Sequence, residues 1–434
     1  MLKLFSALII TTGVLMSASL PAYETQTLDN GLQVVVIPME NNTSVISTDI
    51  FYKVGSRNEV MGKSGIAHML EHMNFKSTDN LKSGQFDEIV KGMGGISNAS
   101  TGFDYTHYFI KSSTKNLDKS LDLFGELMES LKLKDDEFQP ERNVVAEERR
   151  WRTDNSPLGY MYFRLFNNAY IYHPYHWTPI GFMGDIQNWK LEDITNFHET
   201  FYQPKNAIII VTGDVKAKDV FEQAKKRFAR IKNKKDIPTV HQVEPKQDGA
   251  KRLVVYKESE VEMLAITYHI PNYQHKDQPA LSAISEMLSS GKSSRLYQSL
   301  VNDKRLANQI YAYNMENIDP GLFIFMAVCN PGVKAEEVEK EILSQIEELR
   351  TTYVEDSELA KVKISTKADF IYSLESSSSV ADLFGGYLAR GDLEPLMTYE
   401  DNINALTPQD IQTAALKYFD ETQSTTVILR KQDD

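Results

Sequence analysis

Short apolar runs open both halves of the chain and predict strands. Residues 33–37 and 252–256 are rich in β-branched residues and are bounded by polar ones, which is typical of strands. Residues 116–134 and 333–350 instead carry apolar residues at three- and four-residue spacing, which predicts amphipathic helices. Because strands are followed by runs of helix within each half, the pattern indicates an α+β fold.

The pattern of the first half returns in the second half at a nearly constant spacing. Two helix-like segments each lead into an apolar run, 191–202 before 207–211 and 407–419 before 425–429. Asp193 aligns with Asp410 at an offset of 217 residues, and residues 66–70 align with residues 284–288 at an offset of 218. A repeat of this length indicates two copies of one domain rather than a solenoid. We therefore predict two homologous domains that arose by internal duplication.

The first 22 residues have the pattern of a secretory signal peptide. Lys3 precedes an apolar stretch over residues 4–16, and small residues follow. Cleavage is expected between Ser19 and Ala22. The alternative is an uncleaved membrane anchor, but the apolar stretch is shorter than the roughly 20 residues that a span needs. We therefore expect a protein exported across an inner membrane into the periplasm.

A polar segment with prolines and little periodicity lies where the two copies meet, and this is typical of a linker. We place a signal peptide at residues 1–22, the first domain at 23–235, the linker at 236–252 and the second domain at 253–434. Within the two domains no apolar run reaches the length of a membrane span. We expect no membrane span once the signal peptide is removed.

The charge of the chain argues against some classes of partner. Hydrophobic content of 41% and charged content of 25% are ordinary for a soluble globular protein. Removal of residues 1–22 takes away only Lys3, which leaves 46 basic and 60 acidic residues and a net charge of −14. This charge disfavours nucleic acid and anionic membranes as partners. Cys329 is the only cysteine, so the chain has no internal disulfide.

Residues 68–72 carry the strongest chemical signal. Their order is His, Met, Leu, Glu, His, and positions four apart on a helix lie on one face. His68 and His72 can therefore bind one zinc ion, while Glu71 lies beside it without having to be a ligand. Glu71 could then accept a proton from a water molecule that the metal activates. This is the inverted zincin motif, H-x-x-E-H; two solvent-facing histidines are the alternative.

A catalytic zinc site needs a third protein ligand, and an acidic segment offers several. In residues 140–150, Pro140 suits the first turn of a helix. Glu141 and Glu148 are seven residues apart and share a helix face, whereas Glu147 lies about 100° away from it. The alternative is an ordinary solvated face of a charged helix.

Taken together, these segments resemble the pitrilysin family of metallopeptidases. The resemblance lies in residues 68–78 and 142–148 and extends over nearly the whole mature chain. It implies a zinc-dependent endopeptidase with one Zn²⁺ per chain, in which each half is a mainly antiparallel sheet backed by helices. Peptides or unstructured polypeptide segments would be cleaved inside an enclosed chamber.

The resemblance also implies roles for single residues. It makes His68, His72 and Glu148 the zinc ligands and Glu71 the general base. Glu141 would support the site without touching the metal. The segment 94–106 is similar to the edge strand on which the family holds the substrate backbone, which would make Asn98 and Ala99 substrate-binding residues.

The second half departs from the family pattern. At the repeat offset, His68, Glu71 and His72 align with Glu286, Ser289 and Ser290, so no second zinc is expected.

The family usually carries an Arg and a Tyr seven residues apart in the second half, where Val301 and Asn308 stand. We therefore expect a heterodimer with an inactive paralogue that supplies the pair, as in the mitochondrial processing peptidase. The alternative is a homodimer that uses Arg305 or Tyr311. A non-catalytic scaffold and a structural zinc protein are the rival functions.

Overall fold

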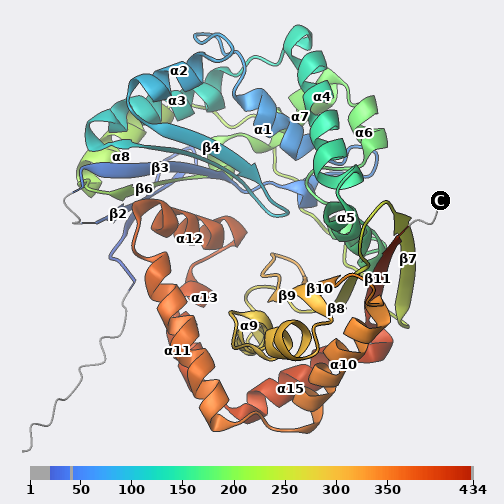
Figure 1. Ribbon diagram of the computed structural model, residues 1–434. Coiled ribbons are helices and arrows are strands. Elements are labelled where there is room, and N and C mark those ends of the chain that lie inside the picture. Colours follow the sequence, from blue (N-terminus) through green and yellow to red (C-terminus); the bar gives the residue numbers. More distant parts are fainter. Residues whose placement is uncertain (1–19, 40–42, 432–434) are drawn as a thin grey trace, which may run out of the picture.

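The computed structural model describes residues 20–39 and 43–431, so most of the predicted signal peptide lies outside the described residues. The described chain forms two sheets, one in each half (Figure 1). The strands of the first sheet are β1 (Glu24–Thr27), β2 (Gln33–Pro38), β3 (Val45–Tyr52), β4 (Ile96–Thr101), β5 (Thr106–Ser113) and β6 (Ala207–Gly213). The strands of the second sheet are β7 (Lys251–Lys257), β8 (Met263–His269), β9 (Ala307–Asn314), β10 (Leu322–Cys329) and β11 (Thr425–Lys431).

The two sheets have the same topology once β1 is set aside. Their strand orders are β2-β6-β3-β5-β4 and β7-β11-β8-β10-β9. In each sheet the first pair is parallel and every other pair is antiparallel. This correspondence confirms the predicted fold of two homologous α+β domains with mainly antiparallel sheets.

Helices connect the strands in both halves. In the first half they are α1 (Ile66–Asn74), α2 (Gln85–Gly92), α3 (Leu117–Ser130), α4 (Asp135–Arg149), α5 (Pro157–Ala169), α6 (Met183–Asn188), α7 (Leu191–Phe201) and α8 (Ala217–Phe228). In the second half they are α9 (Gln278–Ser289), α10 (Ala335–Thr351), α11 (Asp356–Ser373), α12 (Ser377–Arg390), α13 (Glu394–Met397), α14 (Tyr399–Ala405) and α15 (Pro408–Tyr418). The helices predicted at 116–134 and 333–350 correspond to α3 and α10.

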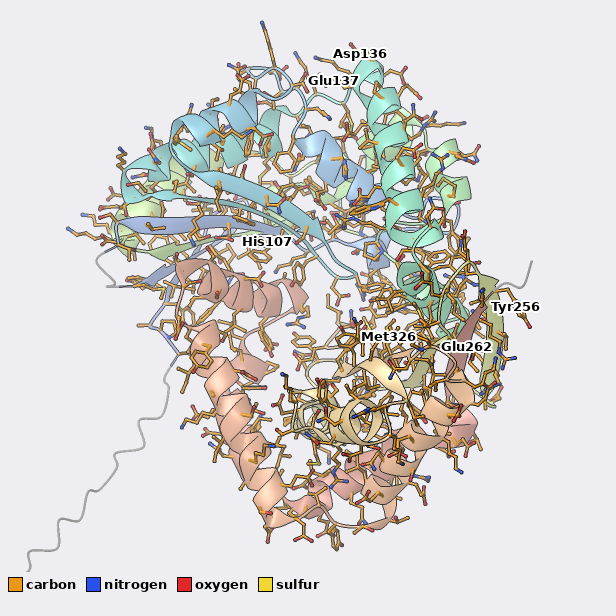
Figure 2. The ribbon with its side chains drawn as sticks, viewed as in Figure 1. His107, Asp136, Glu137, Tyr256, Glu262 and Met326 are labelled. Carbon is orange, nitrogen blue, oxygen red and sulfur yellow. The ribbon has the colours of Figure 1, made fainter. Side chains whose placement is uncertain are left out.

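The prediction for Pro140 was wrong, because α4 begins five residues earlier and contains this proline in its interior. Three acidic residues form the first turn: Asp135, Asp136 and Glu137. Figure 2 shows Asp136 and Glu137 at the outer end of the helix. Negative side chains at this end are stabilised by the helix dipole, which outweighs the preference of proline for the first turn.

The stretch between α8 and β7 contains no helix or strand. The predicted linker at 236–252 overlaps this stretch, and its last two residues belong to β7. The domain boundaries themselves stay a prediction. Among the described residues, no helix is both long and apolar enough to cross a membrane.

Each sheet is apolar on both faces. In β2, Val34 and Val36 pack against the helices of the first half, whereas Val35 and Ile37 point to the opposite face. Such alternation follows from the two-residue period of a strand. Because both faces are buried, inner strands such as β6 and β10 are nearly continuous apolar runs, and each sheet needs helices on two sides.

The second cover of each sheet comes from the other half of the chain. The helix α12 of the second half packs on β3 and β6 of the first sheet (Figure 1). In return, α5 of the first half packs on β8 and β11 of the second sheet. Phe384 on α12 and Phe166 on α5 are buried in these two contacts. The two halves therefore exchange helices, and neither half has a complete core alone.

A buried polar contact joins the halves a second time. Asp104 of the first half accepts hydrogen bonds from the amide nitrogen of Ile318 at 3.0 Å and from the side chain of Asn317 at 3.1 Å. Asp319 accepts from Arg57 at 2.5 Å and lies 2.9 Å from Nε2 of His173. These contacts fix the turn between β9 and β10 against the first half.

Gly385 provides a test of the helix exchange. A Cβ atom on Gly385 would lie 2.1 Å from the ring of Phe51 on β3. A Gly→Ala change inside a helix normally stabilises it by roughly 1 kcal/mol, but overpacking costs about 1–3 kcal/mol. We therefore expect Gly385→Ala to lower the urea midpoint of unfolding. Gly184 in α6 has no atom within 4 Å of such a Cβ, so Gly184→Ala is the matched control. A midpoint for Gly385→Ala at or above that of the control would contradict the contact.

Candidate metal centre

The helix α1 holds His68, Glu71 and His72 on one side because its other side is buried. Met69, Leu70 and Met73 are fully buried in the core of the first half. With a period of 3.6 residues, this leaves the three polar side chains together on the face away from the core.

The start of α1 is held by a buried carboxylate. Gly65 precedes the helix with a φ of 85°, a conformation that favours glycine. The two oxygens of Glu59 accept hydrogen bonds from the amide nitrogens of Gly65, at 2.9 Å, and Ala67, at 2.8 Å. Burial raises the pKa of Glu59 to about 8. These bonds use amide groups that would otherwise have no partner at a helix start, so they fix the position of the helix.

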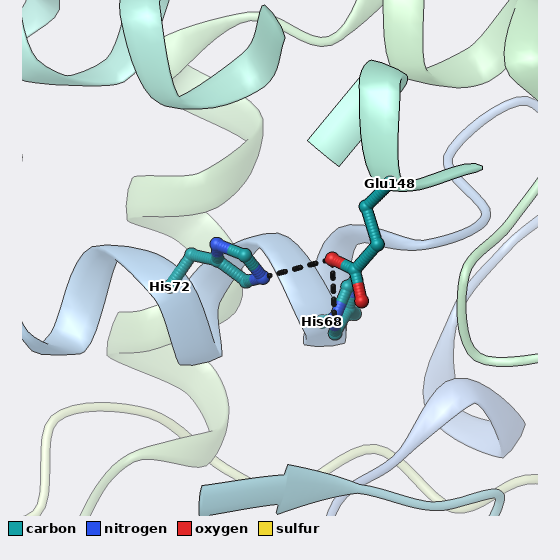
Figure 3. Close-up of side chains that lie close together, drawn as sticks. All are labelled: His68, His72 and Glu148. Atoms are coloured by element: carbon teal, nitrogen blue, oxygen red, sulfur yellow. Dashed lines mark ion pairs between the residues drawn. The ribbon is translucent and has the colours of Figure 1, made fainter. Parts of the chain in front are cut away.

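The structure brings His68, His72 and Glu148 together (Figure 3). Nε2 of His72 lies 3.4 Å from Oε2 of Glu148, and Nε2 of His68 lies 3.6 Å from the same oxygen. Tetrahedral zinc bound at roughly 2.0–2.2 Å needs donor atoms about 3.3 Å apart. Two imidazole nitrogens and one carboxylate oxygen therefore have both the chemistry and the spacing to hold zinc with one position open. No other such group of side chains occurs in the part of the chain that the structure describes.

The charges in this cluster are strongly coupled. Burial and the neighbouring His72 lower the pKa of His68 to about 4. Burial would also lower the pKa of His72, but its hydrogen bonds to Glu141 and Glu148 raise it to about 9. The hydrogen bond to His72 lowers the pKa of Glu148. A proton on His72 therefore compensates the negative charge of Glu148. A metal ion bound between His68, His72 and Glu148 would supply that positive charge instead.

Glu141 lies behind His72 on the side away from Glu148. Its Oε1 is 2.8 Å from Nδ1 of His72, and its Oε2 is 2.5 Å from Nζ of Lys76. A carboxylate on Nδ1 fixes the imidazole so that Nε2 points to the metal position. The hydrogen bonds to His72 and Lys76 outweigh burial and lower the pKa of Glu141.

Glu71 lies beside the cluster but is not one of the three converging groups. Thr101, the last residue of β4, donates a hydrogen bond to its carboxylate. Burial raises the pKa of Glu71, and the bond from Thr101 offsets only part of this effect.

Asn98 and Ala99 lie on β4, an edge strand of the first sheet that, among the described residues, pairs with β5 alone. Together with His68, Glu71 and His72 they line a groove of about 1040 Å³. The groove therefore runs along an open strand edge that leads to the three converging groups.

Two residues after Glu148 were missed in the sequence. Arg150–Asp154 forms a π-helical turn that continues α4. In this turn Nε of Arg152 lies 3.0 Å from Oε1 of Glu148, and the side chain of Trp151 is 72% exposed. A single π-turn has no periodic signal that sequence analysis could find, although such turns are frequent at functional sites.

Three other histidines, His107, His173 and His176, have partners outside this cluster. Nε2 of His107 lies 2.7 Å from Asp49, and His173 contacts Asp319 between the two halves. Nδ1 of His176 lies 2.6 Å from the carbonyl oxygen of Tyr170.

In the second half, α9 occupies the place of α1, but no comparable cluster is found there among the described residues. Glu286 accepts a hydrogen bond from Ser365, and Ser289 binds the backbone of Ala312. These side chains fix α9 to its neighbours.

Arg305 and Tyr311 are the residues that could replace the missing Arg and Tyr, and they lie in different places. Arg305 is exposed in the turn before β9. Tyr311 on β9 lines a cavity that also contains His68 and Glu148, so only Tyr311 of this pair is near the metal centre.

Family models match both halves of the chain. Residues 34–170 match the family described as Insulinase (Peptidase family M16), and residues 188–366 match the Peptidase M16 inactive domain. The Helicobacter pylori protein named Zinc protease PqqE is 58% identical over 99% of this chain and 98% of its own length.

Two further matches extend the comparison. A crystal structure of a protease from Helicobacter pylori has a TM-score of 0.93 at 59% identity and covers 95% of this chain and 100% of that chain. A probable mitochondrial-processing peptidase subunit beta from Arabidopsis thaliana is 27% identical and covers 92% of this chain and 77% of its own length.

Zinc affinity should distinguish the role of Glu148 from that of its neighbour Glu147. We expect Glu148→Ala to lower zinc affinity by more than the roughly 10–100-fold that loss of an outer partner costs. Glu147 is 71% exposed and pairs with Arg150, so Glu147→Ala should leave zinc affinity unchanged. Zinc content after dialysis and zinc titration measure both variants. Equal losses would mean that the wrong glutamate has been assigned.

Proposed function

Because this chain belongs to the insulinase family of M16 peptidases, we propose that it is a zinc-dependent endopeptidase. Its substrates would be peptides or unstructured polypeptide segments cleaved in an enclosed chamber. The observation that carries the proposal is the convergence of His68, His72 and Glu148 with Glu71 beside them. The name of the relative from Helicobacter pylori, a zinc protease, supports it.

Each residue of the centre has a separate task in this proposal. His68, His72 and Glu148 hold one zinc ion per chain, and zinc bound there lowers the pKa of water and polarises a carbonyl group. Glu71 takes the proton of the attacking water and passes it to the leaving amine. Burial raises the pKa of Glu71 towards the range that suits proton transfer. Glu141 orients His72.

The substrate would bind by adding a strand to the edge of β4. One edge of β4 has no strand partner among the described residues, and its backbone groups can pair with an extended peptide. Asn98 and Ala99 are in the middle of this edge and line the groove. Strand addition needs an extended segment whose backbone groups are free, and peptides and unstructured polypeptide segments supply one.

A non-catalytic scaffold is the second function to consider. The observation that favours it is in the second half, which matches an inactive domain and carries Val301 and Asn308 in place of Arg and Tyr. Against it stands the first half, where His68, His72 and Glu148 converge with Glu71 beside them. We therefore propose that the first half is catalytic and that the second half alone lacks a metal site.

We also propose that the chain works in the periplasm with a paralogous partner. The location rests on the signal-like pattern of residues 1–22. The partner would be an inactive chain of the same fold that brings an Arg and a Tyr to the metal centre. A homodimer that relies on Tyr311 is the alternative, and the position of Tyr311 beside His68 supports it.

The role of Glu71 can be tested apart from zinc binding. Glu71→Gln should retain zinc and lose peptidase activity, because the change removes a proton acceptor but no ligand. General-base loss typically costs about 10²–10⁴ in rate. Zinc content and cleavage of an unstructured peptide are measured side by side, with His68→Ala as the variant that should lose metal. If Glu71→Gln loses zinc as completely as His68→Ala, Glu71 is a ligand and the assignment is wrong.

The partner proposal makes a separate prediction. The mature chain alone should cleave peptides feebly, and a paralogue with the Arg and Tyr should raise turnover by about 10²–10³, which is the usual effect of an oxyanion helper. Mass in solution and turnover are measured with and without the paralogue. Full activity from a monomer or homodimer, unaffected by any paralogue but abolished by Tyr311→Phe, would favour the homodimer and refute the heterodimer.

A further inference from the structure

The carboxylate of Glu148 uses its two oxygens for different contacts. Oε2 is the atom that converges with the ring nitrogens of His68 and His72, at 3.6 Å and 3.4 Å. Figure 3 shows one oxygen of Glu148 joined by dashed lines to both histidines, whereas the other oxygen has no such line. The second oxygen, Oε1, lies 3.0 Å from Nε of Arg152. One oxygen therefore faces the proposed zinc position, and an arginine holds the other one.

The backbone and the side chain of Arg152 are both held in place by neighbouring residues. The guanidinium lies over the ring of Trp151, with Cζ 5.8 Å from the ring centroid, which is within the range of a cation–π contact. A Cβ atom on Gly159 of α5 would lie 1.9 Å from the carbonyl oxygen of Arg152. Because glycine has no Cβ atom, α5 can pack directly against the backbone of Arg152.

The π-helical turn that carries Arg152 is closed by another arginine. Arg149 is buried, and its Nε and Nη2 each lie 3.1 Å from Oδ1 of Asp154, the last residue of the turn. Its guanidinium also lies over the ring of Phe163 on α5, with Cζ 3.9 Å from the ring centroid. These contacts involve no atom of the Arg152 side chain, which is 65% exposed. Replacement of that side chain should therefore leave the turn folded.

A second ion pair on the same segment provides a comparison. Arg150 pairs with Glu147, and these two side chains are 43% and 71% exposed. Such exposed pairs contribute little to stability, and neither residue belongs to the converging group. Glu148 differs from Glu147 because it is only 17% exposed and its other oxygen faces the two histidines.

From these contacts we propose that Arg152 is a positioning residue of the metal centre, which holds Oε1 of Glu148 so that Oε2 faces His68 and His72. This inference rests on the proposed zinc site and names a residue that sets the direction of one ligand. The hydrogen bond from an outer partner fixes the orientation of a metal-binding side chain. Arg152 would therefore act on the metal through Glu148.

The positive charge of Arg152 would have the opposite effect on zinc binding. A guanidinium repels a metal cation, so removal of the charge alone would strengthen zinc binding. Removal of a group that positions Glu148 would weaken it, because the carboxylate would lose its fixed direction. The sign of the change in zinc affinity therefore separates positioning from simple charge repulsion.

The experiment compares Arg152→Met with Arg150→Met in the purified mature chain. Zinc dissociation constants are measured by competition with a chelator, and urea midpoints of unfolding show that both variants are folded. We expect Arg152→Met to weaken zinc binding by about 10–100-fold, the usual effect of losing an outer partner. Arg150→Met should stay within about twofold of wild type, because its pair is exposed on both sides.

Two further variants test whether Arg152 acts through Glu148. Arg152→Lys should bind zinc within about threefold of wild type, because an ammonium group can also donate a hydrogen bond to Oε1. In the Glu148→Ala background, Arg152→Met should cause no further loss beyond about threefold, because the group that Arg152 positions is absent. A merely structural effect of Arg152→Met would persist in that background.

The outcomes separate this inference from the proposed function. Wild-type protein that binds no zinc would overturn the proposed function and the role of Arg152 with it. If the wild type binds zinc, then equal affinities for Arg152→Met and Arg150→Met, or tighter binding by Arg152→Met, would refute the positioning role and leave the function intact. An unchanged zinc affinity with a raised KM for an unstructured peptide would assign Arg152 to substrate binding and would also overturn the proposal.

Discussion

The burial of both faces of each sheet is the constraint on which the rest of the structure depends. A sheet with two apolar faces needs two covers, and each half of the chain supplies only one of them for itself. The reciprocal packing of α5 and α12 satisfies both sheets. Before the chain reaches the second sheet through α5, it passes a segment that packs against α1. That segment is the end of α4 and its π-helical turn, and it brings Glu148 over α1.

The metal centre and its surroundings follow from this path of the chain. The helix α1 is fixed by Glu59 at its start and by its buried face, and this sets the positions of His68 and His72. Glu148 comes to them from α4, and the walls of the neighbouring cavity come from α5 and the second sheet. Among its described residues, the second half has no group of side chains that could hold a metal ion. In the proposed function, the second half packs on the first sheet to complete its core, and it forms one wall of the substrate site.

Sequence analysis predicted most of the fold because the signals were local. The apolar runs of β2, β6, β7 and β11 and the spacing of apolar residues in α3 and α10 depend on neighbouring residues only. The near-constant offset between the halves relates two such local patterns to each other. The exchange of α5 and α12 could not be predicted in this way. An apolar run such as 322–329 shows that a strand is buried on both faces, but it does not show which helix covers it. The early start of α4 was missed because Pro140 was taken as a helix start, although three acidic residues precede it.

The candidate site, like the fold, could be predicted only in part from the sequence. His68, Glu71 and His72 follow from helical spacing, and Glu148 followed from its resemblance to a known family, since spacing alone left Glu141 open. Thr101, Arg152 and Tyr311 reach the site from a strand end, a π-turn and the other half, so no sequence interval relates them to α1.

The most direct test of the proposed zinc-dependent cleavage is to strip the purified protein of metal with a chelator and return zinc stepwise, while zinc content and cleavage of an unstructured peptide are followed together. The account predicts that cleavage disappears with the metal and returns in proportion to one zinc per chain. Cleavage that survives complete removal of metal would contradict it.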